Sequence, residues 1–440
     1  MNQTFMKERK VLPLVLSMSL PMVISMAVNS LYNIVDSYFV AKLSEKAMTA
    51  LALVYPVQNL INAIAIGFGI GINASVAFYL GAEDRERADQ AASCGLFLNF
   101  MHGAALTVLS IAAMPLFLRA FSRDKQIIDM ALTYADRAFA FSVVIALGIS
   151  FEKIFQSVGN MKISMISMIC GFVTNIILDP ILIFGPGVFP AMGIAGAAYA
   201  TGIGQIVTLA VYLLCLVVSP VPVKIGRKGL RMDKAVVGKL YGIGIPATLN
   251  MALPSLLISA LNGILAGFSE TYVLVLGVYY KLQTFIYLTA NGIIQGIRPL
   301  VGYNYGAGEH ERVEKIYRTT LGLTMGVMLA GTLLSWAVPQ WLIGLFTANE
   351  QTVQIGVNAL HIISLGFAAS AVSVSCSGAL EGLGKGTPSL MISLARYVVV
   401  IIPAAFLFSR LAGAQGVWYG FCFTELVTAV FSGFIYRKSV

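Results

Sequence analysis

Residues 298–313 read RPLVGYNYGAGEHERV, and a related stretch, INASVAFYLGAEDRERA, occupies residues 72–88. Adding 225 to the numbers of the second stretch aligns the two: Gly81-Ala82 falls on Gly306-Ala307 and Glu86-Arg87 on Glu311-Arg312. An apolar composition alone does not produce a shared register that includes charged residues. The chain therefore contains an internal repeat.

The repeat extends well beyond these two stretches. The same offset holds without gaps for about seventy positions, with matches at Pro21 and Pro246, Ser30-Leu31 and Ser255-Leu256, Ser44-Glu45 and Ser269-Glu270, Gln58 and Gln283, Gly67 and Gly292, and Gly71 and Gly296. It later pairs Gly159 with Gly384, and an offset of 220 then pairs Gly193, Gly196 and Tyr199 with Gly413, Gly416 and Tyr419. Two copies of one folding unit are expected.

The composition is that of a membrane protein. The chain is 58% hydrophobic and 11% charged, whereas soluble domains carry about 25% charged residues. Apolar segments of spanning length fall at 11–40, 48–80, 92–118, 134–155, 163–185, 192–218, 238–265, 273–302, 316–338, 355–380, 388–409 and 414–436. We expect an all-α membrane protein with twelve transmembrane helices in two six-helix bundles. Because six is even, a pseudo-two-fold axis along the membrane normal should relate the bundles.

The basic residues predict the orientation. With a cytoplasmic N-terminus, 19 Lys and Arg residues lie in inside segments and 7 in outside segments, which is the bias that sets topology. Both termini are expected to be cytoplasmic, in a bacterial plasma (inner) membrane. The net charge of +9 is then explained by membrane lipids, and no nucleic-acid partner is expected. The predicted division is a bundle at 1–218, a cytoplasmic linker at 219–237 and a bundle at 238–440.

Two acids in the first bundle are candidates for ion coupling. Asp36 and Asp179 lie in apolar segments at a similar predicted depth, and carboxylates at such positions are usually functional. Asn29 and Asn33 share one helix face with Asp36, and Asn175 shares one with Asp179. Thr201 adds a hydroxyl at similar depth. Two carboxylates in one low-dielectric pocket cannot both ionise cheaply, so they could take up a proton, or Na+ with amide and hydroxyl oxygens as further ligands.

The alternative is that these acids only join helices, or that Asp36 reaches outward to the membrane surface. The repeat provides a comparison, because the offset of 225 places Leu261 and Ala404 at the corresponding positions. The shared scaffold therefore does not require acids there.

The second bundle carries a different polar set. We predict a substrate cavity lined by Tyr32, Asn33, Tyr279, Lys281, Gln283, Gln295 and Arg298. An alternative stays open for the charged residues: Arg298 and Arg396 either line this cavity or neutralise Glu425 within the bundle. Aromatic and methionine side chains could give the cavity an adaptable apolar wall, although most such residues pack between helices.

Chemistry other than transport has little support. Cys94, Cys170, Cys215, Cys376 and Cys422 form no CxxC pair, and His102, His310 and His361 are isolated, so neither a metal site nor a cofactor is expected. The stretch GLGKGT at 382–387 lacks the first glycine and the Ser or Thr of a phosphate loop. No cluster of nucleophile and base is evident. We therefore do not expect an enzyme.

The signature stretch and its copy resemble the multidrug and toxic compound extrusion (MATE) family, in particular its bacterial MepA/DinF-like type. The segments NIVDSY, TNIILDP and AAYATG match that branch, and the resemblance implies a coupling site at Asp36, Asn175, Asp179 and Thr201. Another branch, which includes NorM, carries acids on helices 7 and 10. The seventh segment here has none, and the tenth has none before Glu381.

The resemblance implies an antiporter that exports amphipathic, often cationic compounds by alternating access, with H+ or Na+ as the coupling ion. A monomer is expected. The alternative within transport is an exporter of an endogenous metabolite or of a lipid-linked precursor, as a flippase would be.

Overall fold

The regular structure of residues 3–187 and 190–440, which the computed structural model describes, consists of helices only. The first half contains α1 (Phe5–Glu8), α2 (Val11–Ala41), α3 (Glu45–Gly81), α4 (Arg85–Phe121), α5 (Lys125–Ala140), α6 (Ser142–Ser157), α7 (Met161–Phe184) and α8 (Ile194–Val218). After a 3-10 turn at Arg227–Leu230 follow α9 (Lys234–Ala266), α10 (Glu270–Gly306), α11 (His310–Ala337), α12 (Pro339–Gly344), α13 (Glu350–Ser364), α14 (Phe367–Gly382), α15 (Gly386–Leu394), a π-helical turn (Ala395–Val399), α16 (Ile401–Ala412) and α17 (Gln415–Ser439). The predicted all-α class is confirmed.

The number of spans agrees with the prediction when two bent helices are each counted once. In the described part of the chain, ten helices are long and apolar enough to cross a membrane, and two bent pairs bring the number to twelve. The pairs are α5 with α6, bent by 44°, and α13 with α14, bent by 54°. The fourth and tenth spans were expected to be single helices at 134–155 and 355–380. They begin earlier, and each breaks near its middle.

The two breaks occupy equivalent positions of the repeat. Phe141 separates α5 from α6, and adding 225 gives Gly366, which separates α13 from α14. The loops after α3 and α10 correspond in the same way. Glu83 has a φ of 59° and its counterpart Gly308 a φ of 76°, so the shared turn needs a left-handed residue, which glycine adopts without strain.

Helix starts are repeated as well. The Ser44 side chain accepts a hydrogen bond from the Ala47 N–H, and the Ser269 side chain accepts one from the Thr271 N–H. Each serine precedes a glutamate, at positions 45 and 270, whose charge favours the helix N-terminus. The sequence repeat therefore has a physical basis in how each copy begins its second long helix.

The chain forms two compact units, and two helices belong to both. One unit consists mainly of Ile24–Thr248, and the other of Thr4–Val23 with Leu249–Val440. Helix α2 therefore changes unit at residue 24 and α9 at residue 249, which are 225 residues apart. The predicted division, with boundaries at 218 and 238, stays a prediction. The compact units differ from it because the first part of α2 packs with the second unit and the first part of α9 packs with the first unit.

Glycines hold these first parts against their units. In the first unit, a Cβ on Gly67 would lie 2.5 Å from the Thr248 nitrogen, and one on Gly71 would lie 2.6 Å from the Leu240 carbonyl oxygen. In the second unit, a Cβ on Gly292 would lie 2.7 Å from the Val23 Cα. The helices cross here at a separation that only glycine permits.

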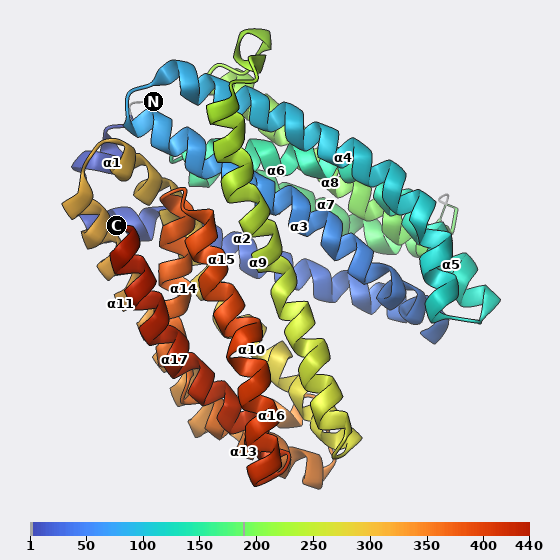
Figure 1. Cartoon of the computed structure of the whole chain (residues 1–440). Helices are drawn as coiled ribbons and strands as arrows, with labels where there is room; N and C mark the ends of the chain where they lie inside the picture. Colours follow the sequence, from blue (N-terminus) through green and yellow to red (C-terminus); the bar gives the residue numbers. More distant parts are fainter. Residues whose placement is uncertain (1–2, 188–189) are drawn as a thin grey trace. The chain divides into compact units, whose positions relative to one another are not determined.

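Within each unit the long helices pack side by side (Figure 1). In the first unit α3 packs against α4 and α6, and α7 packs against α8. In the second unit α10, α11 and α14 pack against one another, and α17 packs against α14 and α16. Large apolar side chains such as Leu116, Val217 and Val430 are 77–80% exposed. Such outward-facing surfaces suit a lipid environment, in which every backbone group is satisfied within the helices.

The predicted linker contains a segment that is attached to the first unit. The Lys224 N–H donates to Asp89 Oδ1 at 2.7 Å, and the Gly226 N–H donates to the Ser93 hydroxyl at 3.2 Å. The Cys94 thiol donates to the Gly229 carbonyl at 3.2 Å. Residues 224–231, here called the strap, therefore lie along the first turns of α4.

Candidate functional site

The two predicted acids lie in the interior of the first unit. Asp36 is on α2 and is 9% exposed, and Asp179 is on α7 and is fully buried. They are close enough for their negative charges to repel each other. In α7, Asp179 directly precedes Pro180. Proline cannot donate a backbone hydrogen bond, so the carbonyl one turn earlier lacks its usual helical partner.

Asn175 connects Asp179 to the neighbouring helix α8. In the orientation that satisfies its amide, the Asn175 side-chain N–H donates to Asp179 Oδ2 at 3.0 Å. Its oxygen accepts the Thr201 backbone N–H at 2.9 Å and lies 3.3 Å from the Thr201 hydroxyl. The four residues predicted for the coupling site are therefore brought together in one buried cluster. Their role as a coupling site stays a prediction.

Aromatic hydroxyls complete the surroundings of the acids. The Tyr32 hydroxyl interacts with Thr201, and the Tyr32 ring stacks on Phe172 with ring centres 5.3 Å apart. The buried Tyr134 hydroxyl interacts with Gln58 and faces the charges of both acids. These groups are neutral, so the negative charge of the cluster is not offset by them.

Each acid keeps one oxygen without a hydrogen-bond partner among the described residues, Oδ1 of Asp36 and Oδ1 of Asp179. A buried carboxylate oxygen without a partner is costly, and a proton or a cation would satisfy it. No group of three His, Cys, Asp or Glu side chains that could hold a metal occurs in the part of the chain described. The donor set of carboxylate, amide and hydroxyl oxygens instead suits a proton or a hard monovalent cation.

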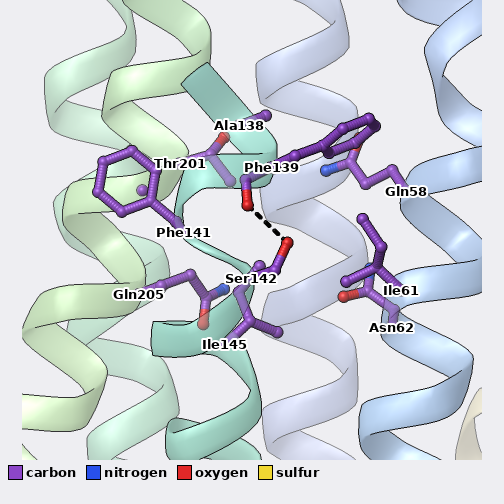
Figure 2. Close-up of a pocket in the computed structure, with 11 residues that line it drawn as sticks. Gln58, Ile61, Asn62, Ala138, Phe139, Phe141, Ser142, Ile145, Thr201 and Gln205 are labelled. Carbon is purple, nitrogen blue, oxygen red and sulfur yellow. Dashed lines mark hydrogen bonds between the residues drawn. The ribbon is translucent and has the colours of Figure 1, made fainter. Parts of the chain in front are cut away.

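A small cavity lies beside this cluster and has Thr201 in its wall. It is lined by Gln58, Ile61, Asn62, Ala138, Phe139, Phe141, Ser142, Ile145, Thr201, Gly202 and Gln205. Figure 2 shows the lining at the break between α5 and α6, where the Ser142 hydroxyl donates to the Phe139 carbonyl at 2.7 Å. Three of its lining residues, Gln58, Asn62 and Gln205, carry carboxamides, while most of the lining is apolar.

The residues predicted for a substrate cavity are dispersed. In the first unit Tyr32 belongs to the acid cluster, and Asn33 is exposed and donates to the Asn29 carbonyl at 2.8 Å. In the second unit, all on α10, Tyr279 is buried in the core beside Phe421, Lys281 is exposed, and Gln283 and Gln295 are half-buried. Their contact with a substrate stays a prediction.

The charged residues of the second unit form two separate ion pairs. Arg396 Nη2 lies 2.7 Å from Glu425 Oε1, so of the two alternatives neutralisation describes Arg396. Arg298 Nη2 instead lies 2.7 Å from Glu381 Oε2. Asn250 also donates to Glu381, at 3.1 Å, and so ties α9 to the end of α14.

The sequence reasoning missed a buried polar cluster on α6. Lys153 Nζ lies 2.7 Å from Glu152 Oε1, and the Gln156 amide donates to the same oxygen at 2.7 Å. The repeat offset contained the signal, because Gln156 falls on Glu381 and Asn73 on Arg298. Asn73 donates to the Lys153 carbonyl at 3.2 Å. Each unit thus carries a buried ion pair at the equivalent position of the repeat, Lys153–Glu152 in the first unit and Arg298–Glu381 in the second.

Comparison with known proteins agrees with this architecture. The family model described as MatE matches twice, at residues 21–181 and 246–407. The chain belongs to the MatE family. The matches start 225 residues apart (246 − 21) and end 226 apart (407 − 181), which confirms the internal repeat. The chain is thus a multi-pass membrane transporter.

Among curated relatives, multidrug export protein MepA of Staphylococcus aureus (strain MRSA252) is 24% identical over 94% of this chain and 90% of its own length. MepA of Staphylococcus saprophyticus is also 24% identical, with the same coverage. A solved MATE structure in the straight conformation has a TM-score of 0.94, and a MOP superfamily transporter from Pyrococcus furiosus has one of 0.93. Each of these structures is 24% identical and matches 100% of this chain and 98% of its own, which confirms the fold.

Proposed function

We propose that this transporter exports amphipathic, often cationic organic compounds in exchange for H+ or Na+. The observation that carries the proposal is the acid cluster of the first unit, with two buried carboxylates that each retain an unpartnered oxygen. The names of the curated relatives, which are multidrug export proteins, support the substrate class.

The electrostatics of the cluster supply a coupling mechanism. With both acids ionised, the first unit holds two negative charges in a low-dielectric interior, and that state is unfavourable. Uptake of a proton, or of Na+ bound by Asp36, Asp179 and the oxygens of Asn175 and Thr201, offsets one of the charges. A cationic substrate drawn to the same negative region competes with the ion. Entry of one therefore favours release of the other, which is the requirement for antiport.

The same cluster would bias the conformational change. If the two units rock between inward-facing and outward-facing states, the state that opens the acids to the outside is favoured when they bind the coupling ion there. The proposal places both termini in the cytoplasm of a bacterial cell, because that orientation gives the excess of basic residues on the inside.

Efflux of ethidium from right-side-out vesicles tests the proposal, with pH and sodium gradients imposed separately. The wild type should drive efflux with at least one of the gradients. Asp36→Asn and Asp179→Asn should each abolish gradient-driven efflux, while the exposed Glu311→Gln, a matched removal of one carboxylate, should keep it. Full efflux in Asp36→Asn would exclude this coupling site. A lipid-linked substrate would instead leave dye transport absent in the wild type as well.

A further inference from the structure

The second unit contains a buried cation that is held by its own chain. Arg396 is 6% exposed, and its guanidinium donates twice to Glu425 Oε1, at 2.7 and 3.0 Å, and once to Oε2 at 3.1 Å. It also donates to the Tyr287 hydroxyl at 2.9 Å. The guanidinium carbon lies 5.5 Å from the Tyr287 ring centre and 5.3 Å from that of Tyr397. A carboxylate with two aromatic rings is the usual protein environment for an organic cation.

The repeat shows that this environment coincides with the cavity of the first unit. Adding 225 places Tyr287 on Asn62 and Ser370 on Ile145, and the offset of 220 places Glu425 on Gln205. All three of the first-unit residues line the cavity. Arg396 itself falls on Gly171, which has no side chain. Gly171 packs closely against Thr208 and Gly204 of α8, so the Arg396 guanidinium has no counterpart in the first unit.

The backbone around Arg396 departs from regular α-helical geometry. Residues 395–399 form a π-helical turn, closed by the Val400 N–H donating to the Ala395 carbonyl at 2.9 Å. Such a turn holds one more residue than an α-helical turn and often occurs at functional sites. The two family matches differ by one residue in length, 161 against 162. Conversion of the π turn to α would rotate Arg396 by about 100° around the helix and separate it from Glu425.

The remaining polar groups are already arranged around this position. The Tyr287 hydroxyl donates to the Ser370 hydroxyl at 2.7 Å, which fixes the ring against α14. The buried Tyr280 hydroxyl has no hydrogen-bond partner in the described part of the chain. The Glu425 side chain is 13% exposed, so its neighbours do not enclose it completely.

We propose that Glu425, Tyr287 and Tyr397 form a second binding site for organic cations, which Arg396 occupies as a built-in competitor. A lipophilic cation displaces the guanidinium and takes its place on the carboxylate between the two rings. The ligand class rests on the proposed function, but the site itself is independent of Asp36 and of ion coupling.

Equilibrium dialysis of radiolabelled tetraphenylphosphonium against the purified full-length protein in detergent tests the proposal. In Arg396→Lys, the ammonium loses the bidentate pairing and the flat stacking, so it competes less well. We expect at least a tenfold gain in affinity, and Arg396→Lys combined with Glu425→Gln should reverse the gain. Tyr397→Phe removes only one hydroxyl contact of Arg396, at 3.4 Å, and should give a smaller gain of a few-fold.

Thermal melting and gel filtration show which variants are folded. If Arg396→Lys does not fold, Tyr397→Phe decides the question. Unchanged affinity and stoichiometry in the folded variants would overturn the proposal. If Arg396→Lys also raises the affinity for tetraphenylphosphonium in an Asp36→Asn background, the second site is established even when coupled efflux is absent. Loss of efflux alone contradicts the proposed function but not the second binding site.

Discussion

The Thr201 backbone N–H donates to the Asn175 side-chain oxygen at 2.9 Å, and this bond determines which way the Asn175 amide faces. Because a backbone N–H in helix α8 cannot rotate away, the amide nitrogen is directed at Asp179. The acid is thus positioned by the main chain of one helix through the side chain of another. The Thr201 side chain adds only a neutral hydroxyl.

This relationship predicts unequal effects for the two residues. Thr201→Ala retains the backbone N–H and loses only neutral hydrogen bonds of the hydroxyl, so the affinity for the coupling ion should change by about 2–10-fold. Asn175→Ala removes a hydrogen bond to a charged group and should change the affinity by roughly 10–100-fold. The change is upward if the ion is H+, because the lost bond favours ionised Asp179, and downward if it is Na+, because a ligand oxygen is lost. The ion concentration that gives half-maximal efflux in proteoliposomes measures both effects. Thr201→Ser should resemble the wild type, and affinity changes of equal size in Thr201→Ala and Asn175→Ala would contradict this account.

The residues of the acid cluster could be chosen from sequence because carboxylates are rare in spanning segments and because their repeat counterparts, Leu261 and Ala404, are apolar. The cavity beside the acid cluster could not be predicted from the sequence. Its wall is formed where α5 and α6 break at Phe141, and no proline or glycine marks this break in the sequence. Gln58, Asn62 and Gln205 come from helices whose mutual rotation is set by tertiary packing, which periodicity does not reveal.

The Arg298–Glu381 pair should be essential to the stability of the second unit. The two side chains are 16% and 7% exposed, so Glu381→Gln would leave a buried guanidinium without its counter-charge. Removal of one partner of such a pair costs about 3–5 kcal/mol. Thermal unfolding in detergent should show a large decrease in Tm. The pair Arg318–Glu314 is the matched control, with side chains 76% and 38% exposed, and Glu314→Gln should change stability by less than about 1 kcal/mol.

Removal of both charges separates pairing from packing. The double variant Arg298→Met/Glu381→Met should recover most of the stability lost in Glu381→Gln, because paired apolar replacements of similar volume are often neutral. The Ser389 hydroxyl also donates to Glu381, at 3.3 Å. A double variant that is less stable than both single variants would show that hydrogen bonding to Asn250 or Ser389, and not charge pairing, maintains this end of the unit.

The glycine crossings predict a second stability effect. A Cβ at Gly67 would lie 2.7 Å from the Thr248 Cα, and one at Gly292 would lie 2.8 Å from the Val23 nitrogen. Backbone atoms cannot move aside as flexible side chains do, so Gly67→Ala and Gly292→Ala should each destabilise the protein by roughly 1–3 kcal/mol or more. Gly263 and Gly277 have open space at this position. Alanine at these two positions should be neutral or stabilising. If it lowered the Tm as much as Gly67→Ala and Gly292→Ala do, the close helix contacts at Gly67 and Gly292 would not be what limits these positions.

The repeat and the spans were accessible from sequence, but the exchange of helix segments was not. Helices α2 and α9 read as uniform apolar stretches on both sides of Pro21 and Pro246. Which unit each segment packs against depends on close contacts such as Gly292 with Val23, between residues far apart in the chain. The conserved offset identified equivalent positions, yet it contained no information on which unit each helix segment joins.

The carboxyl of Asp124, at the start of α5, should titrate below its ordinary range. Its pKa is lowered chiefly by the hydrogen bond from Lys46, whose Nζ lies 2.9 Å from Asp124 Oδ2. A lowered pKa means that this contact stabilises the fold above the ordinary carboxyl value of about 3.9 and is lost as the pH falls through the lowered value. Carbon-13 NMR of aspartate-labelled protein, with the resonance assigned from Asp124→Asn, gives the midpoint. In Lys46→Met the midpoint should rise towards the ordinary value, and an unchanged midpoint would contradict the assignment.

Attachment of the strap predicts that the basic segment resists trypsin. Arg227, Lys228 and Arg231 are exposed, yet a protease needs an extended, mobile backbone. The strap is held on α4 because its Lys224 and Gly226 N–H groups donate to Asp89 and Ser93. The variant Asp89→Ala/Ser93→Ala should be cut between 224 and 234 several-fold faster than the wild type. Gly229→Ala should have a similar effect, because its Cβ would lie 2.9 Å from the Asp89 carbonyl oxygen. Glu311→Ala, which removes an exposed acid of the second unit, should not change the rate. Cleavage that requires inside-out vesicles would also place the strap in the cytoplasm, and cleavage from the other side would reverse the proposed orientation.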